Sequence, residues 1–233
     1  MTLDVLGLKK TYGEHCALDV PALRIEEGEI VGLVGSNGAG KTTFLRLVLD
    51  LLPATEGEVH IDGRNVAGND AWKAHTGSYL DPSFLMDFLT VDEYLDFIGS
   101  IYGLSKSETA IARRPFQSFY PDEVFGETTR FIRDLSMGNA KKIGLIAAMF
   151  VRPRLLLLDE PFANLDPPSQ IRLKQLLRML HAAHGTTMII SSHDLVHVTE
   201  VCKRITVLEA GRIVRDLSTS DATLRELEQY FAS

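Results

Sequence analysis

The sequence has few of the features that mark exported, metal-rich or membrane-spanning chains. Its 233 residues include two cysteines, Cys16 and Cys202, with no neighbouring His or second Cys, so neither a disulfide framework nor a cysteine metal site is indicated. The start has no apolar segment behind a basic one, which predicts no secretory signal and favours a reducing, cytoplasmic setting. The longest apolar stretches, such as 144–151, fall below the roughly 18 to 20 residues that cross a bilayer, so any membrane role requires a partner.

Concentrated positive charge is also missing. The formal net charge is -7, and the basic residues gather only in pairs such as Arg113–Arg114 and Lys141–Lys142. Because binding to a polyanion leaves a basic patch in the sequence, nucleic acid is not expected as a partner. The hydrophobic fraction of 45% and the charged fraction of 24% are those of a folded globular chain, and the length suits one domain over 1–233.

Strand-like and helix-like segments alternate along the chain. Residues 2–31 alternate in polarity between turn residues, which predicts short antiparallel strands at the N-terminus. Residues 81–142 are aromatic-rich with short helical patterns, which indicates an inserted helical subdomain of about 81–143 between core segments of about 1–80 and 144–233. The expected core strands are 29–34, 57–62, 154–159, 186–191 and the hairpin 204–217, and the expected helices begin near 41, 167, 194 and 221. This order predicts an α/β fold with a mostly parallel sheet.

A glycine-rich loop between an expected strand and an expected helix carries the strongest motif. It reads Gly35, Ser36, Asn37, Gly38, Ala39, Gly40, Lys41, Thr42, Thr43, which matches the phosphate-binding P-loop pattern in full. Glycines let successive backbone N–H groups converge on phosphate oxygens, and the following helix adds a favourable dipole. We expect Lys41 to reach the β- and γ-phosphates of a nucleotide and the Thr42 hydroxyl to ligate Mg²⁺.

A second acidic motif follows the run of four leucines at 155–158. Asp159 and Glu160 come at the end of this expected strand, where the carboxyl edge of a parallel sheet presents side chains to a ligand. We predict Asp159 as a partner of Mg²⁺ and Glu160 as the group that polarises the attacking water. Alone, such a pair is as often a solvated turn; the P-loop favours the functional interpretation.

With these motifs in order, the chain resembles the ATPase domain of ABC transporters over nearly its whole length. The resemblance implies a P-loop NTPase core with an N-terminal antiparallel β subdomain and an inserted α-helical subdomain, and it implies ATP with Mg²⁺ as ligands. It also implies that Tyr12 stacks on adenine and that His193 lies near the γ-phosphate, with Lys41, Glu160 and His193 as the catalytic set. An ordinary strand-end tyrosine and a surface histidine are the alternatives.

Residues 135–139 resemble the signature segment of this family, usually LSGGQ. The resemblance implies that Ser136 and Gly138 contact the γ-phosphate held by a second subunit in an ATP-dependent homodimer or heterodimer. Met137 and Asn139 depart from the pattern, and Met costs more than Gly wherever a positive φ is required. Without the family context, a Leu-Ser turn before a helix is a plain N-cap.

The Q-loop of the family matches least well. The corresponding position is Asp81, a third candidate metal ligand, which is shorter and more charged than the usual glutamine. The apolar side chains that follow are where the family docks its membrane partner, although they also suit a subdomain core: Phe84, Leu85, Met86, Phe88, Leu89, Tyr94, Leu95 and Phe97.

We therefore expect an ATPase subunit, peripheral on the inner face of the cell membrane, that powers transport with a separate permease. The chain lacks the extra domain that many sugar importers carry, which favours export of the ABC-2 or drug-exporter type. Two alternatives stay open. One is a weakened ABC subunit that binds ATP as a regulatory partner, and the other is a soluble ABC ATPase that acts on ribosomes or DNA.

Overall fold

Two sheets form the core of the protein in a computed structural model that describes residues 1–120 and 130–232. The larger sheet has five parallel strands, and its sixth strand is antiparallel to its neighbour. In spatial order the strands are β10 (Arg212–Ser218), β9 (Arg204–Glu209), β3 (Ile30–Val34), β8 (Thr187–Ser192), β7 (Leu155–Leu158) and β6 (Thr76–Tyr79). The expected mostly parallel sheet is confirmed.

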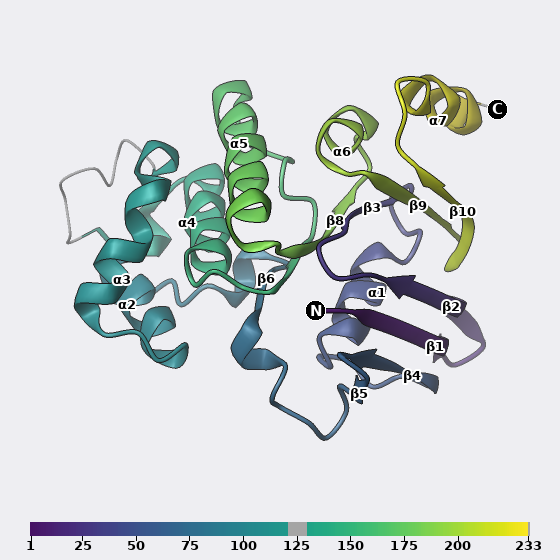
Figure 1. Ribbon diagram of the computed structural model, residues 1–233, viewed down its shortest axis with the longest axis horizontal. Helices are drawn as coiled ribbons and strands as arrows, with labels where there is room; N and C mark the ends of the chain where they lie inside the picture. The colour runs from purple at the N-terminus through teal and green to yellow at the C-terminus, as the bar shows by residue number, and fades with distance from the viewer. Residues whose placement is uncertain (121–129, 233) are drawn as a thin grey trace.

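The smaller sheet is antiparallel and contains the N-terminal strands, as the sequence predicts. Its order is β2 (His15–Ile25), β1 (Leu3–Tyr12), β4 (Glu56–Ile61) and β5 (Arg64–Asn65). Helix α1 (Lys41–Val48) lies beside this sheet (Figure 1). Phe44, Leu45 and Val48 of α1 share one buried cluster with side chains of both sheets, so the helix that follows the P-loop is fixed from two sides.

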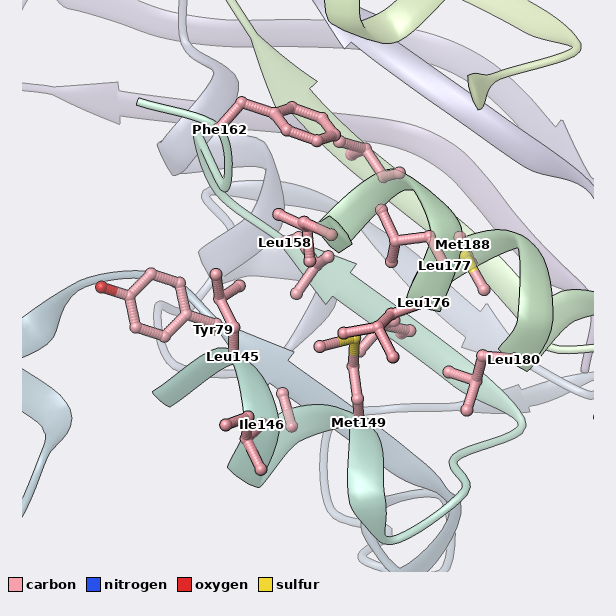
Figure 2. Packing of buried hydrophobic residues seen from close by; sticks show 14 of the residues in the cluster. Tyr79, Leu145, Ile146, Met149, Leu158, Phe162, Leu176, Leu177, Leu180 and Met188 are labelled. Atoms are coloured by element: carbon pink, nitrogen blue, oxygen red, sulfur yellow. The ribbon is translucent and has the colours of Figure 1, made fainter. Parts of the chain in front are cut away.

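Strand β7 is covered on both faces, which explains its unbroken run of leucines. Leu155 and Leu157 belong to the cluster around α1, whereas Leu156 and Leu158 belong to a second cluster on the opposite face. Figure 2 shows Leu158 among side chains of the helices that cover this second face. The next residue, Asp159, therefore directly follows a strand that is buried on both faces.

The elements described between β6 and β7 are helical. They are η2 (Pro82–Phe84), α2 (Val91–Ile101), α3 (Lys106–Arg113), η3 (Arg114–Phe119), η5 (Ile132–Asp134) and α4 (Met137–Phe150), whereas residues 121–129 of the expected helical subdomain lie outside the described residues. The boundary expected between 143 and 144 falls inside α4, because this helix is continuous and its C-terminal half packs under β6 and β7. Helix α4 therefore joins the helical part to the core.

Three further helices follow β7. They are α5 (Pro167–His184), α6 (Leu195–Val201) and α7 (Thr223–Ala232). Asp166 caps the start of α5 by accepting a hydrogen bond from the Ser169 amide, and Gly185 ends this helix with φ +63°, the conformation for which glycine is best suited. In the part of the chain that the structure describes, no helix is both long and apolar enough to cross a membrane.

Candidate functional site

The P-loop joins β3 to α1, as its motif predicts. Gly38 (φ +83°) and Gly40 (φ +105°) adopt conformations that side chains disfavour, and no side chain caps the start of α1. Lys41 is buried, and its ammonium donates hydrogen bonds to the carbonyls of Gly35 (2.7 Å) and Ser36 (3.2 Å). The loop thus curls around the lysine and leaves the helix N-terminus free for an anion.

A cavity of about 360 Å³ lies over this loop, within the usual size range of nucleotide and cofactor sites. It is lined by Tyr12, His15, Ala17, Asn37, Gly38, Ala39, Gly40, Lys41, Thr42, Thr43 and Glu160. The structure therefore brings Tyr12 and the P-loop together. His15 and Ala17 were missed by sequence reasoning; the hairpin register that pairs His15 with Tyr12 brings β2 into the wall.

The Tyr12 ring is half exposed at the end of β1. The Lys10 ammonium lies 5.1 Å from the ring centroid and also donates a hydrogen bond to the Pro53 carbonyl (2.8 Å). Lys10 therefore supports the ring in the place from which it lines the cavity. An aromatic ring at this edge suits the stacking role that the family resemblance implies.

Thr42, which lines the cavity, contacts Asp159 at the end of β7. The Thr42 hydroxyl donates a hydrogen bond to Asp159 Oδ2 (2.5 Å), and the Ser191 hydroxyl at the end of β8 donates to Asp159 Oδ1. Asp159 is 6% exposed. A hydroxyl and a carboxylate are hard oxygen ligands, and Mg²⁺ commonly takes one or two such groups together with substrate phosphates, so this pair fits the metal.

Glu160, two residues beyond β7, lines the cavity, and its carboxylate contacts two partners. Its Oε1 is 3.4 Å from the Lys41 ammonium, and its Oε2 is 2.9 Å from Nδ1 of His193. Because a carboxylate only accepts, Nδ1 of His193 carries the hydrogen of this contact. The Oε1 atom is buried without a hydrogen-bond partner among the described residues, which leaves an acceptor for a water molecule beside the P-loop.

The main chain of Glu160 is held as firmly as its carboxylate. Its φ is +47°, a left-handed conformation that is uncommon for residues other than glycine. Its N–H donates a hydrogen bond to Ser191 Oγ (2.9 Å), and its carbonyl accepts one from the Lys141 ammonium of α4 (2.5 Å). Burial lowers the pKa of Lys141 to about 8, against the opposing effect of the Glu160 and Asp159 charges. Sequence reasoning missed Ser191 and Lys141, although Ser191 precedes the predicted His193 by only two positions.

The signature segment starts α4, apart from the residues that line the cavity. Ser136 is the N-cap and accepts a hydrogen bond from the Asn139 amide (3.3 Å). Met137 is the first helical residue, and its φ is not positive, so this position does not require glycine. Its side chain is 69% exposed. Gly138 does matter sterically, because a Cβ there would lie 3.0 Å from the Asn164 carbonyl oxygen.

Asp81 is not among the residues that line the P-loop cavity. Its carboxylate accepts a hydrogen bond from the Ser83 amide (2.8 Å) and caps η2, and this bonding to Ser83 holds the pKa of Asp81 below its ordinary value. It lines a second cavity, of about 270 Å³, between β6, η2, α2 and α4. Its role as a metal ligand remains a prediction.

The fold and the cavity together define a P-loop ATPase. A sequence model of the ABC transporter family matches residues 18–163. The chain belongs to the ABC transporter family, as one of its ATP-binding domains. The resemblance to the family is thereby confirmed, whereas the narrower likeness to exporters of the ABC-2 type is not.

Named relatives are similar over most of this chain. The sulfate/thiosulfate import ATP-binding protein CysA of Bradyrhizobium diazoefficiens is 33% identical over 223 residues, which cover 95% of this chain and 65% of CysA. The uncharacterized ABC transporter ATP-binding protein YhaQ of Bacillus subtilis is 34% identical, over 92% of this chain and 70% of YhaQ. The chain thus spans less than two thirds of the length of this CysA protein.

Solved structures show the same fold. An ATP-binding subunit of an ABC transporter superimposes with a TM-score of 0.87 at 25% identity and covers 100% of this chain and 98% of its own. The dimeric bacterial ABC transporter cassette MJ0796 gives a TM-score of 0.83 at 25% identity, over 94% of this chain and 99% of its own.

Proposed function

We propose that the chain binds ATP with Mg²⁺ and hydrolyses it to power transport of a solute through a separate permease, at the inner face of the cell membrane. The observation that carries this proposal is the contact between Lys41 and Glu160 in the wall of the P-loop cavity, with His193 bonded to the other oxygen of Glu160. Family membership supports the coupling to transport. The CysA relatives are named as sulfate/thiosulfate importers, so the expectation of export has no support.

The side chains divide the work at the phosphates. Lys41 and the amides at the start of α1 would bind the phosphate oxygens, and Tyr12 would stack on the adenine base. Thr42 and Asp159 would hold Mg²⁺, which when bound supplies positive charge against the phosphate oxygens. Glu160 would orient a water through Oε1, which accepts no hydrogen bond from the described residues, with His193 fixing the other oxygen.

The purified chain compared with Lys41→Ala tests the enzymatic part. This variant removes the positive charge of Lys41 and its hydrogen bonds to the loop. We therefore expect the parent chain to turn over ATP and Lys41→Ala to have lost this turnover. ATP binding by the parent chain without turnover would favour the weakened, regulatory subunit instead. Co-purification with ribosomes or DNA, in place of membranes, would favour the soluble ATPase.

Dimerisation around ATP is the second part of the proposal. Ser136 and Met137 stand exposed at the start of α4, where a second subunit has access, and the similar cassette MJ0796 is described as dimeric. The mass in solution of Glu160→Gln with ATP and Mg²⁺ tests it, because arrested hydrolysis should hold the dimer closed. A nucleotide-dependent dimer supports a homodimer; a monomer that binds ATP points to a different partner chain.

The second cavity suits the permease. Phe84 (56% exposed) and Phe88 (60% exposed) present apolar surface at and near it, whereas Tyr94 and Leu95 are buried in the subdomain core. The apolar segment predicted from the sequence therefore divides into a core part and an exposed part. Phe84→Asp is expected to abolish capture by the permease in membranes while ATP turnover of the isolated chain stays. Unchanged capture would contradict this placement.

A further inference from the structure

A buried lysine on α4, Lys141, forms hydrogen bonds to the segment that follows β7. Lys141 lies on α4, is 6% exposed, and reaches residues 19 and 22 positions further along the chain. Its ammonium donates to the carbonyls of Glu160 (2.5 Å) and Ala163 (2.7 Å). Burial of a lysine is costly, so a lysine kept here with two carbonyl acceptors indicates a function for those contacts.

Two neighbouring contacts run between the same helix and the same segment. The Gly138 Cα approaches the Asn164 carbonyl so closely that a Cβ would lie 3.0 Å from its oxygen. Lys142 forms an ion pair with Asp166 (3.5 Å). The start of α4 and residues 160–166 therefore behave as one packed unit, and Lys141 is the member that bonds the residue expected to orient the attacking water.

The conformation of Glu160 explains why that bond matters. With φ +47°, the residue holds a conformation that a glutamate leaves readily unless its surroundings fix it. Ser191 holds its N–H and Lys141 holds its carbonyl, so both ends of the residue are tied to neighbouring elements. The direction of the side chain toward Lys41 and His193 follows from this backbone.

We propose that Lys141 is a positioning residue for ATP hydrolysis: it fixes the left-handed backbone of Glu160 and thereby aims the carboxylate at the site of the water. Lys141 has this role only if the chain hydrolyses ATP as proposed above. It acts through Glu160 and contacts no residue of the P-loop through its described hydrogen bonds.

Lys141→Met in the full-length chain tests the role, because methionine keeps the length and apolar stem of lysine without its donors. We expect kcat to fall about 10- to 100-fold while the Kd for ATP stays within about twofold, since a displaced catalytic group costs rate and not binding. Lys141→Arg should recover part of the rate, because a guanidinium can donate to both carbonyls. In Glu160→Gln, adding Lys141→Met should cause no further loss of kcat.

Lys174→Met is the matched control. Lys174 is as buried as Lys141 (7% exposed) but is bonded to Glu200 of α6 (2.8 Å), so its loss should lower stability and leave kcat unchanged. Wild-type kcat in Lys141→Met, or an additive loss in the double variant, overturns the proposal.

Hydrogen exchange gives a readout that does not need turnover. The amides of Glu160 and Ala163 are hydrogen bonded, to Ser191 Oγ and to the Glu160 carbonyl respectively. Lys141→Met should speed their exchange, and Lys174→Met should not. A parent chain without ATP turnover contradicts the proposed function; in that case unchanged exchange of these amides in Lys141→Met overturns the positioning as well.

Discussion

Two buried lysines contact Glu160, and they differ in which part of it they bind. Lys41 on the P-loop side contacts the carboxylate, whereas Lys141 on the signature-helix side bonds the main-chain carbonyl. Lys41 belongs to a local motif in which nine consecutive residues define their own shape. Lys141 depends on a contact across 19 positions, which only the fold creates. The comparison separates the contact with the reacting carboxylate of Glu160 from the contact that fixes its main chain.

The largest effect should come from the carboxylate itself. In Glu160→Gln the group that polarises water is lost while the hydrogen-bonding shape remains, so we expect kcat to fall about 10³-fold with little change in ATP binding. Steady-state turnover and a binding titration check this. Glu56→Gln, at an exposed position at the start of β4, serves as the control. A loss below about tenfold in Glu160→Gln would contradict the role of Glu160.

A variant at Ser191, on β8, tests the hydrogen bonds that hold the main chain of Glu160. Ser191→Ala deletes the hydroxyl that bonds Asp159 and the Glu160 amide, and an unsatisfied buried polar group costs about 1–3 kcal/mol. We expect kcat to fall about 10- to 30-fold. Ser192→Ala is matched, since Ser192 is also buried but bonds the Asp194 amide. Equal kcat in the two variants would mean that Ser191 affects stability alone.

The signature segment offers a pair of variants with opposite expectations. Gly138→Ala places a Cβ about 3 Å from the Asn164 carbonyl oxygen, so the start of α4 and the segment around Asn164 must move apart. Turnover should therefore drop several-fold. Met137→Gly restores the usual family residue at an exposed helical position and should change the free energy of unfolding by no more than about 1 kcal/mol. Turnover and urea unfolding check both. A large rise in turnover in Met137→Gly would show that the methionine obstructs the second subunit.

Sequence patterns were sufficient where the information is local. The P-loop, the leucine run that ends at Asp159, and the prolines and glycine that bound α5 each determine structure within a few residues. Strand β6 was not anticipated, because Thr76–Tyr79 is short and half polar and forms a strand only by pairing with β7 at the sheet edge.

The parts of the site that the sequence did not reveal depend on distant contacts. His15 lines the cavity because the hairpin register pairs it with Tyr12. Ser191 bonds Asp159 and the Glu160 amide because β8 pairs with β7 in parallel. The pair Lys141–Lys142 looked like surface charge, yet burial and two carbonyls give its first member a structural partner. Asp81 was aligned by counting along the chain; one of its oxygens caps η2, and its role as a metal ligand stays a prediction.

The smallest effect concerns pH. Burial lowers the pKa of Lys141 from 10.5 to about 8, so between these values the unfolded chain binds the proton that the folded chain has released. Stability then rises with pH from about 8 upward, by at most about 1.4 kcal/mol per pH unit for this one proton, and the contribution is flat below 8. In urea unfolding at pH 7, 8, 9 and 9.5, the free energy of unfolding of the wild-type chain should rise relative to that of Lys141→Met only above pH 8. Lys174→Met keeps Lys141 and should follow the wild-type slope, and the nearby tyrosines are common to all three chains. Parallel curves for wild type and Lys141→Met would mean that the lysine is solvated in solution, and its two carbonyl bonds would then be too weak to aim Glu160.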